Sequence, residues 1–235
     1  MLLAIETSSL NGSIALFDDQ ELVAEKNWTK SLSASSPQVH SENLTKNIES
    51  IFNEKNISSK DIKTIAVSIG PGSFTGIRVG INAARALAYA VQASVYTVDS
   101  LTLLAQSFLR KSNLNQVLDL TVVVNAYRNQ LYYMQFQRSA ADWTNSEPPK
   151  VANYDEIANK IAKGSILIGD GCELLKSNLS EDLQKTLQFY PNAYATAATL
   201  GNIAINQSKF QRWNEVVPLY IRKSEAEEKF SSKLK

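Results

Sequence analysis

The N-terminal part of the chain alternates short apolar runs with polar turns, a pattern typical of a small antiparallel sheet. The runs Leu2–Thr7, Ser13–Phe17 and Leu22–Trp28 each have the length and β-rich composition of a strand. Asn11-Gly12 lies between the first two runs, and Asn-Gly is a strong turn signal. We therefore expect three strands joined as an antiparallel meander.

Helical periodicity begins after this meander. Pro37 suits the first turn of a helix, and apolar residues then follow on one helical face: Leu44, Ile48, Ile51 and Phe52. We expect a strand at 62–69, a second helix at 77–92, a strand at 94–98 and a third helix at 99–109. The second helix is apolar nearly all round, which is typical of a helix that is covered on more than one side.

A polar stretch at 110–116 precedes a shorter second half. There the sequence predicts strands at 118–125 and 130–137, a loop at 140–150, a helix at 154–162, a strand at 165–168 and helices at 173–179 and 196–207. This order of elements predicts an α/β protein with a mixed sheet in each half. We expect an N-terminal subdomain over 1–110, a C-terminal subdomain over 111–223 and a charged tail over 224–235.

Composition narrows the classes of function. The 235 residues carry a formal net charge of +1, with 44% hydrophobic and 20% charged residues, as in an ordinary globular protein. A chain that holds nucleic acid by itself normally shows a basic excess, so we expect a partner to supply most phosphate contacts. No apolar stretch approaches the ~20 residues of a membrane span, and no basic region precedes the first apolar run. We therefore expect a cytoplasmic protein.

Two residue types occur once each. The lone Cys172 excludes an intrachain disulfide and favours a packed thiol. The lone His40 excludes metal motifs that need paired histidines. Because His40 lies near the start of the first predicted helix, it is either a packed or capping histidine or an interface residue.

The most informative segment joins the strand at 62–69 to the second helix. It reads Gly70-Pro71-Gly72-Ser73-Phe74-Thr75-Gly76, and a glycine turn between strand and helix can point free backbone N–H groups at an anion. It lacks the Gly-Lys pair of a P-loop, and its glycines do not have the spacing G-x-G-x-x-G. Two interpretations stay open. The loop is either a rigid turn that packs the helix onto the sheet or a nucleotide cradle built on Gly72, Ser73, Thr75 and Gly76.

Three other positions also carry alternatives. Glu6-Thr7 ends the first strand and either closes a local turn or holds a hydrated cation near phosphates. Arg78 lies in the first helical turn, where the helix dipole disfavours a cation. It is either a solvated arginine or a partner for a carboxylate or phosphate. Asp170, within Gly-Asp-Gly, resembles a phosphate-type turn but also fits a plain turn.

Several of these segments together resemble the TsaB (YeaZ) family, the small partner subunits of the bacterial complex that forms threonylcarbamoyladenosine in tRNA. The resemblance covers nearly the whole chain and is most specific at 70–80, with support at 4–8, 13–16, 40–44, 126–132, 169–171 and 218–222. It implies an actin-like ATPase (ribonuclease H-like) fold of two related halves, the second abbreviated. The family usually has Asp where this chain has Asn125, which weakens any cation role for that turn.

The same resemblance implies a non-catalytic partner of TsaD, the larger paralogue that carries the catalytic metal on a histidine pair. After the strand at 94–98 this chain reads Asp99-Ser100-Leu101, with no histidine, which argues against the transferase role. The resemblance also implies that the heterodimer recruits the ATPase TsaE and tRNA, and that ATP and metal bind to partner subunits while this chain alone binds no cofactor. The chain alone could self-associate through the same surface. The expected contacts lie on the first two helices: His40, Leu44, Ile48, Ile77, Arg78, Ile81, Ala84 and Ala88.

Three other functions stay open. A stand-alone actin-like ATPase or kinase would need a carboxylate-bound Mg²⁺ and two full halves. A glycoprotease-like peptidase has little support from one histidine and one cysteine in unrelated motifs. A homodimeric scaffold outside tRNA modification is also compatible with the sequence.

Overall fold

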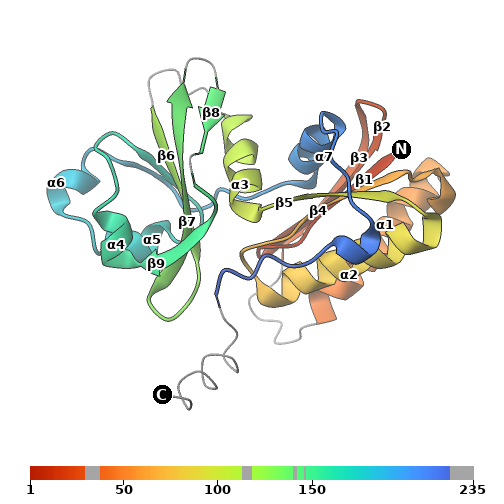
Figure 1. Cartoon of the computed structure of the whole chain (residues 1–235), viewed down its shortest axis with the longest axis horizontal. Coiled ribbons are helices and arrows are strands. Elements are labelled where there is room, and N and C mark those ends of the chain that lie inside the picture. Colours follow the sequence, from red (N-terminus) through yellow and green to blue (C-terminus); the bar gives the residue numbers. More distant parts are fainter. Residues whose placement is uncertain (30–37, 113–117, 140–141, 146, 223–235) are drawn as a thin grey trace, which may run out of the picture.

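The computed structural model describes residues 1–29, 38–112, 118–139, 142–145 and 147–222. Its strands form two mixed sheets, which lie in the right and left parts of Figure 1, and helices cover both. The α/β class and the mixed sheet in each half are therefore confirmed.

The first sheet has the strand order β3-β2-β1-β4-β5. Its strands are β1 (Leu2–Glu6), β2 (Asn11–Asp18), β3 (Glu21–Thr29), β4 (Thr64–Ser68) and β5 (Ser94–Val98). The first three form the predicted antiparallel meander, and β4 runs parallel to both β1 and β5. The carboxyl ends of β1 and β4 therefore meet at one edge of the sheet, where the glycine loop begins.

The second sheet repeats this order. Its strands are β6 (Asp119–Asn125), β7 (Gln130–Ser139), β8 (Asp142–Thr144), β9 (Lys150–Asn153), β10 (Ile166–Ile168) and β11 (Gln188–Tyr190). The central β6 pairs with antiparallel β7 and parallel β10, as β1 pairs with β2 and β4. Gly70 and Gly169 follow the corresponding strands β4 and β10, with φ angles of 98° and 105°. The two halves are therefore related. The loop predicted at 140–150 was wrong in part, because it contains β8 and the start of β9.

Two long helices, α1 (Gln38–Lys55) and α2 (Phe74–Val91), cover one face of the first sheet. Leu44 and Ile51 of α1 pack there against buried strand residues such as Ile14. α2 begins about one turn before the predicted Ile77. The cause is the cap of Ser73, whose Oγ accepts a hydrogen bond from the Gly76 N–H at 3.2 Å.

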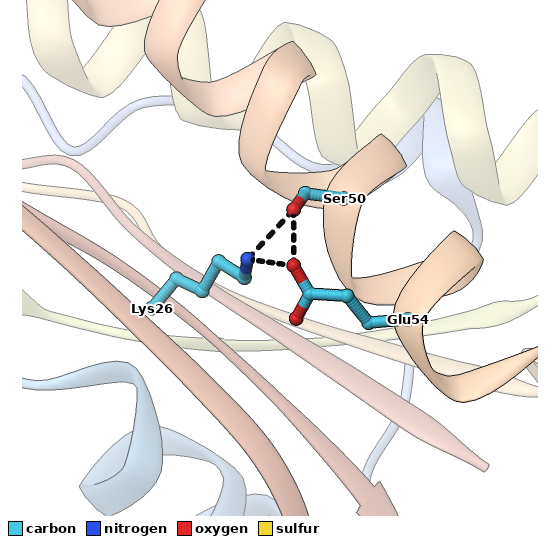
Figure 2. A network of polar contacts seen from close by, with 3 residues as sticks. All are labelled: Lys26, Ser50 and Glu54. Carbon is cyan, nitrogen blue, oxygen red and sulfur yellow. Dashed lines mark hydrogen bonds and ion pairs between the residues drawn. The ribbon is translucent and has the colours of Figure 1, made fainter.

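A polar network ties α1 to the edge strand β3. Lys26 Nζ donates to Ser50 Oγ at 2.6 Å and pairs with Glu54 Oε1 at 2.5 Å, and Ser50 Oγ donates to the same carboxylate oxygen at 2.6 Å (Figure 2). The hydrogen bond from Lys26 is the main cause that lowers the pKa of Glu54. The network joins the C-terminal part of α1 to the edge of the sheet.

The opposite face of the first sheet is covered by α7 (Ala197–Ile205), while α3 (Ser100–Leu109) packs between α7 and the second sheet. The Ala197 N–H donates to Ser13 Oγ of β2 at 2.8 Å. A Cβ atom at Gly201 would lie 2.1 Å from the Phe17 ring, so glycine allows α7 to approach the strand closely. The sequence placed this helix in the subdomain 111–223. That placement is corrected, because α7 belongs to the core of the first sheet. The boundary at residue 110 otherwise stays a prediction.

The remaining helices are short. They are α4 (Tyr154–Ala158), α5 (Cys172–Lys176) and α6 (Glu181–Gln184), with 3₁₀ turns η1 (Ser59–Asp61) and η2 (Trp213–Glu215). The helix predicted at 154–162 is therefore too long. The charged tail predicted at 224–235 lies outside the described residues. Within the described part of the chain, no helix is both long and apolar enough to cross a membrane.

Candidate functional site

The glycine loop packs directly on the end of β1. A Cβ atom at Gly72 would lie 2.4 Å from the carbonyl oxygen of Ser8, and one at Gly76 would lie 2.0 Å from that of Thr7. Both distances are too short for any side chain, so only glycine fits without movement of the backbone. Gly70 also lies in the left-handed φ region that favours glycine. The glycines therefore set how closely α2 approaches the strand.

Hydrogen bonds between the loop and β1 occupy groups that an anion would need. The Ser73 N–H donates to the Ser8 carbonyl at 2.7 Å, and the Gly76 N–H donates to Ser73 Oγ at 3.2 Å. Thr7 Oγ1 donates to the Gly76 carbonyl at 2.8 Å. Thr75 lies exposed in the first turn of α2. This geometry favours the rigid turn over the nucleotide cradle.

Glu6 is fully buried below this loop. Its Oε1 accepts hydrogen bonds from the N–H, at 2.7 Å, and from the hydroxyl of Ser8, as the local-turn interpretation expects. Its Oε2 and the nearby Ser68 Oγ have no partner of ordinary geometry among the described residues. Burial raises the pKa of the Glu6 carboxyl, against smaller lowering contributions from Ser68 and Ser8. Burial therefore disfavours the charged form of the carboxyl, which is the form that a cation would need.

Arg78 packs against two aromatic rings. Its guanidinium carbon lies 3.8 Å from the ring centroid of Phe74 and 5.7 Å from that of Tyr220. Its Nε donates to the Tyr220 hydroxyl at 2.8 Å. Neither interpretation of Arg78 from the sequence included this contact. Sequence reasoning missed the roles of Phe74 and Tyr220, and the family motif at 218–222 was the only signal that could have found Tyr220.

Most side chains expected to meet a partner lie in the core of the first half. Six of them are 9% exposed or less: Leu44, Ile48, Ile77, Ile81, Ala84 and Ala88. The expectation is corrected for these six, because side chains that this chain itself covers are not available to a partner. Arg78 is exposed, whereas the side chain of His40 lies outside the described residues.

Other residues of α2 face outward, and we call them the α2 outer face: Phe74, Thr75, Arg78, Asn82, Ala86, Tyr89 and Ala90. Solvent-facing helix surfaces usually carry several charges, but within this set only Arg78 is charged. Tyr89 is 60% exposed and packs edge-on against Trp213, with ring centroids 5.0 Å apart. Ala86 and Ala90 flank Tyr89, and their small side chains would let another helix approach this end of α2 closely.

The turn after β6 is braced by contacts from elsewhere in the chain. Asp170 Oδ1 accepts a hydrogen bond from the Asn125 N–H at 2.9 Å. Arg222 Nη1 donates to the Ala126 carbonyl at 2.8 Å. Tyr127 follows with a φ angle of 59° and is 73% exposed. Asp170 therefore lies beside the end of the central strand, which the plain-turn interpretation did not include.

Cys172 is buried, and burial raises the pKa of its thiol to about 12. This confirms the prediction of a packed cysteine. Among the described residues, no three His, Cys, Asp or Glu side chains gather in a way that could hold a metal ion.

Several known proteins are similar to this chain in sequence or in structure. The family model described as TsaD, tRNA N6-adenosine threonylcarbamoyltransferase, matches residues 34–230. The tRNA threonylcarbamoyladenosine biosynthesis protein TsaB of Buchnera aphidicola subsp. Schizaphis graminum is 30% identical over 197 residues, which are 82% of this chain and 89% of that protein. TsaB of Bacillus subtilis is 26% identical over 234 residues, 97% of each chain. The structure of YeaZ from Pseudomonas aeruginosa has a TM-score of 0.77 at 20% identity, covering 93% of this chain and 98% of that one. This likeness supports the predicted fold of two related α/β halves.

Proposed function

Because the chain belongs to the TsaB (YeaZ) family, within the wider family described as TsaD, we propose that it serves tRNA threonylcarbamoyladenosine biosynthesis as a non-catalytic subunit that binds and activates TsaD. The observation that carries this proposal is the nearly uncharged α2 outer face. An exposed surface that carries aromatic residues and few charges is typical of a protein interface.

Shared ancestry supports a paired arrangement. Proteins of one fold commonly pair through the same surface on both subunits, around a two-fold axis. A TsaD chain of the same fold would present its own corresponding helix to the α2 outer face. The same surface gives a route to a homodimer when the chain is alone.

The chemistry of the chain supports an accessory role. A histidine pair cannot be formed by a chain with one histidine, and the amides of Ser73 and Gly76 already have partners. We therefore assign ATP, metal and the transfer step to partner subunits, with TsaE and tRNA joining the heterodimer. This role places the chain in the cytoplasm, where tRNA is modified.

The test is complex formation with TsaD of the same organism, measured by light scattering. We compare wild type with Ala86→Arg, which places a long charged side chain on the α2 outer face. Glu181→Arg, on the exposed α6 of the other half, is the control for added charge. Ala84→Arg is unsuitable, because Ala84 is fully buried and arginine there would disrupt the core.

We expect a one-to-one complex with wild type and Glu181→Arg, and its loss with Ala86→Arg. The formation of modified adenosine by TsaD should fall in parallel. If the complex still forms with Ala86→Arg, the interface with TsaD lies outside the α2 outer face, although the two proteins are partners. Wild type that neither binds nor activates TsaD would contradict the proposal itself.

A further inference from the structure

A pocket of about 340 Å³ lies at the carboxyl ends of the central strands of both halves. The β1–β2 turn at 8–11 and Pro71 form one side, and Val124, Asp170 and residues 191–195 form the other. The carboxyl ends of parallel strands are the usual position of ligand sites in α/β proteins. The volume lies within the range of small-molecule pockets.

The walls are largely apolar and carry one acid. Leu104 and Val124 line the pocket together with the segment at 191–195, which includes Pro191 and two alanines. Among the described lining residues, Asp170 alone has a charged side chain. No lysine, arginine or histidine belongs to this lining.

Asp170 is fixed in place by a hydrogen bond and is exposed. Its Oδ1 accepts from the Asn125 N–H, and because the residue is exposed, its carboxylate is open to a ligand. The turn that carries it is tight, because a Cβ atom at Gly169 would lie 2.3 Å from the Val123 carbonyl oxygen. Asp170 is exposed, but neighbouring protein atoms still desolvate its carboxyl in part and raise its pKa. An acid held in such a place is best stabilised by a cationic hydrogen-bond donor.

The same features disfavour a phosphorylated ligand. The Ser8 N–H donates to Glu6, and the Ser73 N–H donates to the Ser8 carbonyl, so neither amide faces an anion. The Asp170 carboxylate would repel a phosphate in a pocket without a lining cation.

We propose that this pocket binds a small organic cation, an amine or amidine on an apolar or aromatic body, with its charged group on Asp170 Oδ2. The apolar walls hold the body of the ligand, and the acid selects its charge. This site does not overlap the α2 outer face, so it does not depend on the proposed partnership with TsaD.

The test uses the full chain and three probes: benzylamine and benzamidine as cations, and benzyl alcohol as the neutral analogue of the same shape. Backbone amide shifts measured by NMR report both the affinity and the position. With about eight non-hydrogen atoms, each cation should bind with a Kd in the millimolar range. Shifts should concentrate at Ser9, Asn11 and Asn192.

Asp170→Asn should weaken the binding of both cations about tenfold to a hundredfold, because it removes one charge-assisted contact. It should leave benzyl alcohol nearly unchanged. The control Asp182→Asn, on the exposed α6, should change neither. Cations that bind equally well to Asp170→Asn, no saturable binding of either cation, or AMP that binds more tightly than benzylamine would each overturn the proposal.

Discussion

The Thr7 hydroxyl donates a hydrogen bond to the carbonyl of Gly76 at 2.8 Å, although 69 residues separate them. At this contact the first turn of α2 meets the end of β1. Alanine in place of glycine normally stabilises a helix by up to about 1 kcal/mol. At Gly76 we expect the opposite sign, with a loss of about 1–3 kcal/mol or more, because the added Cβ would overlap the Thr7 carbonyl oxygen.

Urea unfolding measures this effect. Thr75→Ala, at the exposed neighbour in the same turn, should stay within about 0.5 kcal/mol of wild type. A Gly76→Ala variant as stable as Thr75→Ala would show that the loop relaxes and that the glycine is not required by packing.

Glu6→Gln should stabilise the protein at neutral and basic pH. Glutamine keeps the Oε1 acceptor for Ser8 and places an N–H₂ donor at the position of Oε2, beside the unpartnered Ser68 Oγ. The gain is expected because glutamine removes the cost of burying a charged carboxylate at this position.

The stability difference between Glu6→Gln and wild type should depend on pH, because folding shifts the pKa of Glu6. The pKa of Glu6 is raised in the folded state above its ordinary value of 4.5. The folded state therefore binds the proton more tightly, and wild type loses stability as pH rises from 4.5 through the folded pKa. The advantage of Glu6→Gln should vanish below pH 4.5. A constant difference across this range would contradict a raised pKa of Glu6.

Cys172 should react with iodoacetamide far more slowly in the folded protein than in urea. Its pKa rises from 9.0 to about 12, so at pH 8 the thiolate fraction falls about a thousandfold. Mass spectrometry after timed alkylation gives both rates. Similar rates in the two conditions would show that the thiol is accessible.

Arg78 and Tyr220 should be energetically coupled. We expect a double-mutant cycle with Arg78→Ala and Tyr220→Phe to give a coupling of about 0.5–1 kcal/mol in urea unfolding. Arg78→Lys should not retain the full coupling energy. Lysine lacks the planar guanidinium group and the Nε–H that donates to the Tyr220 hydroxyl. Strictly additive single effects would mean that the contact does not fix the C-terminal segment.

The sequence predicted the elements that depend on local signals. Alternation and turn residues located the meander, and one-face periodicity located the buried side of α1 through Leu44 and Ile51. The helix predicted at 99–109 is α3, and Asp99 caps it by accepting a hydrogen bond from the Thr102 N–H at 2.8 Å. Ser73 was a cap of the same kind, but its place between glycines hid the start of the helix.

Contacts between distant segments could not be predicted in this way. Periodicity showed that α2 is apolar nearly all round, but it did not show which residues the sheet would cover, so Ala84 and Ala88 were assigned to a partner. The return of α7 to Ser13 and the contact of Tyr220 with Arg78 join segments far apart in the chain. Nothing in the local sequence of either segment encodes its partner.

The route of the C-terminal part of the chain has a mechanical consequence. A two-lobed protein that opens around a ligand needs a few flexible residues to connect its lobes. Here the chain passes to the second sheet after α3 and returns at α7. Near the end of the described chain, the Tyr220 hydroxyl accepts a hydrogen bond from Arg78 of the first half. Arg222 donates one to the Ala126 carbonyl of the second half. Rotation about any one connection would strain the others. We therefore expect the two halves to move as one rigid body, with conformational change confined to loops.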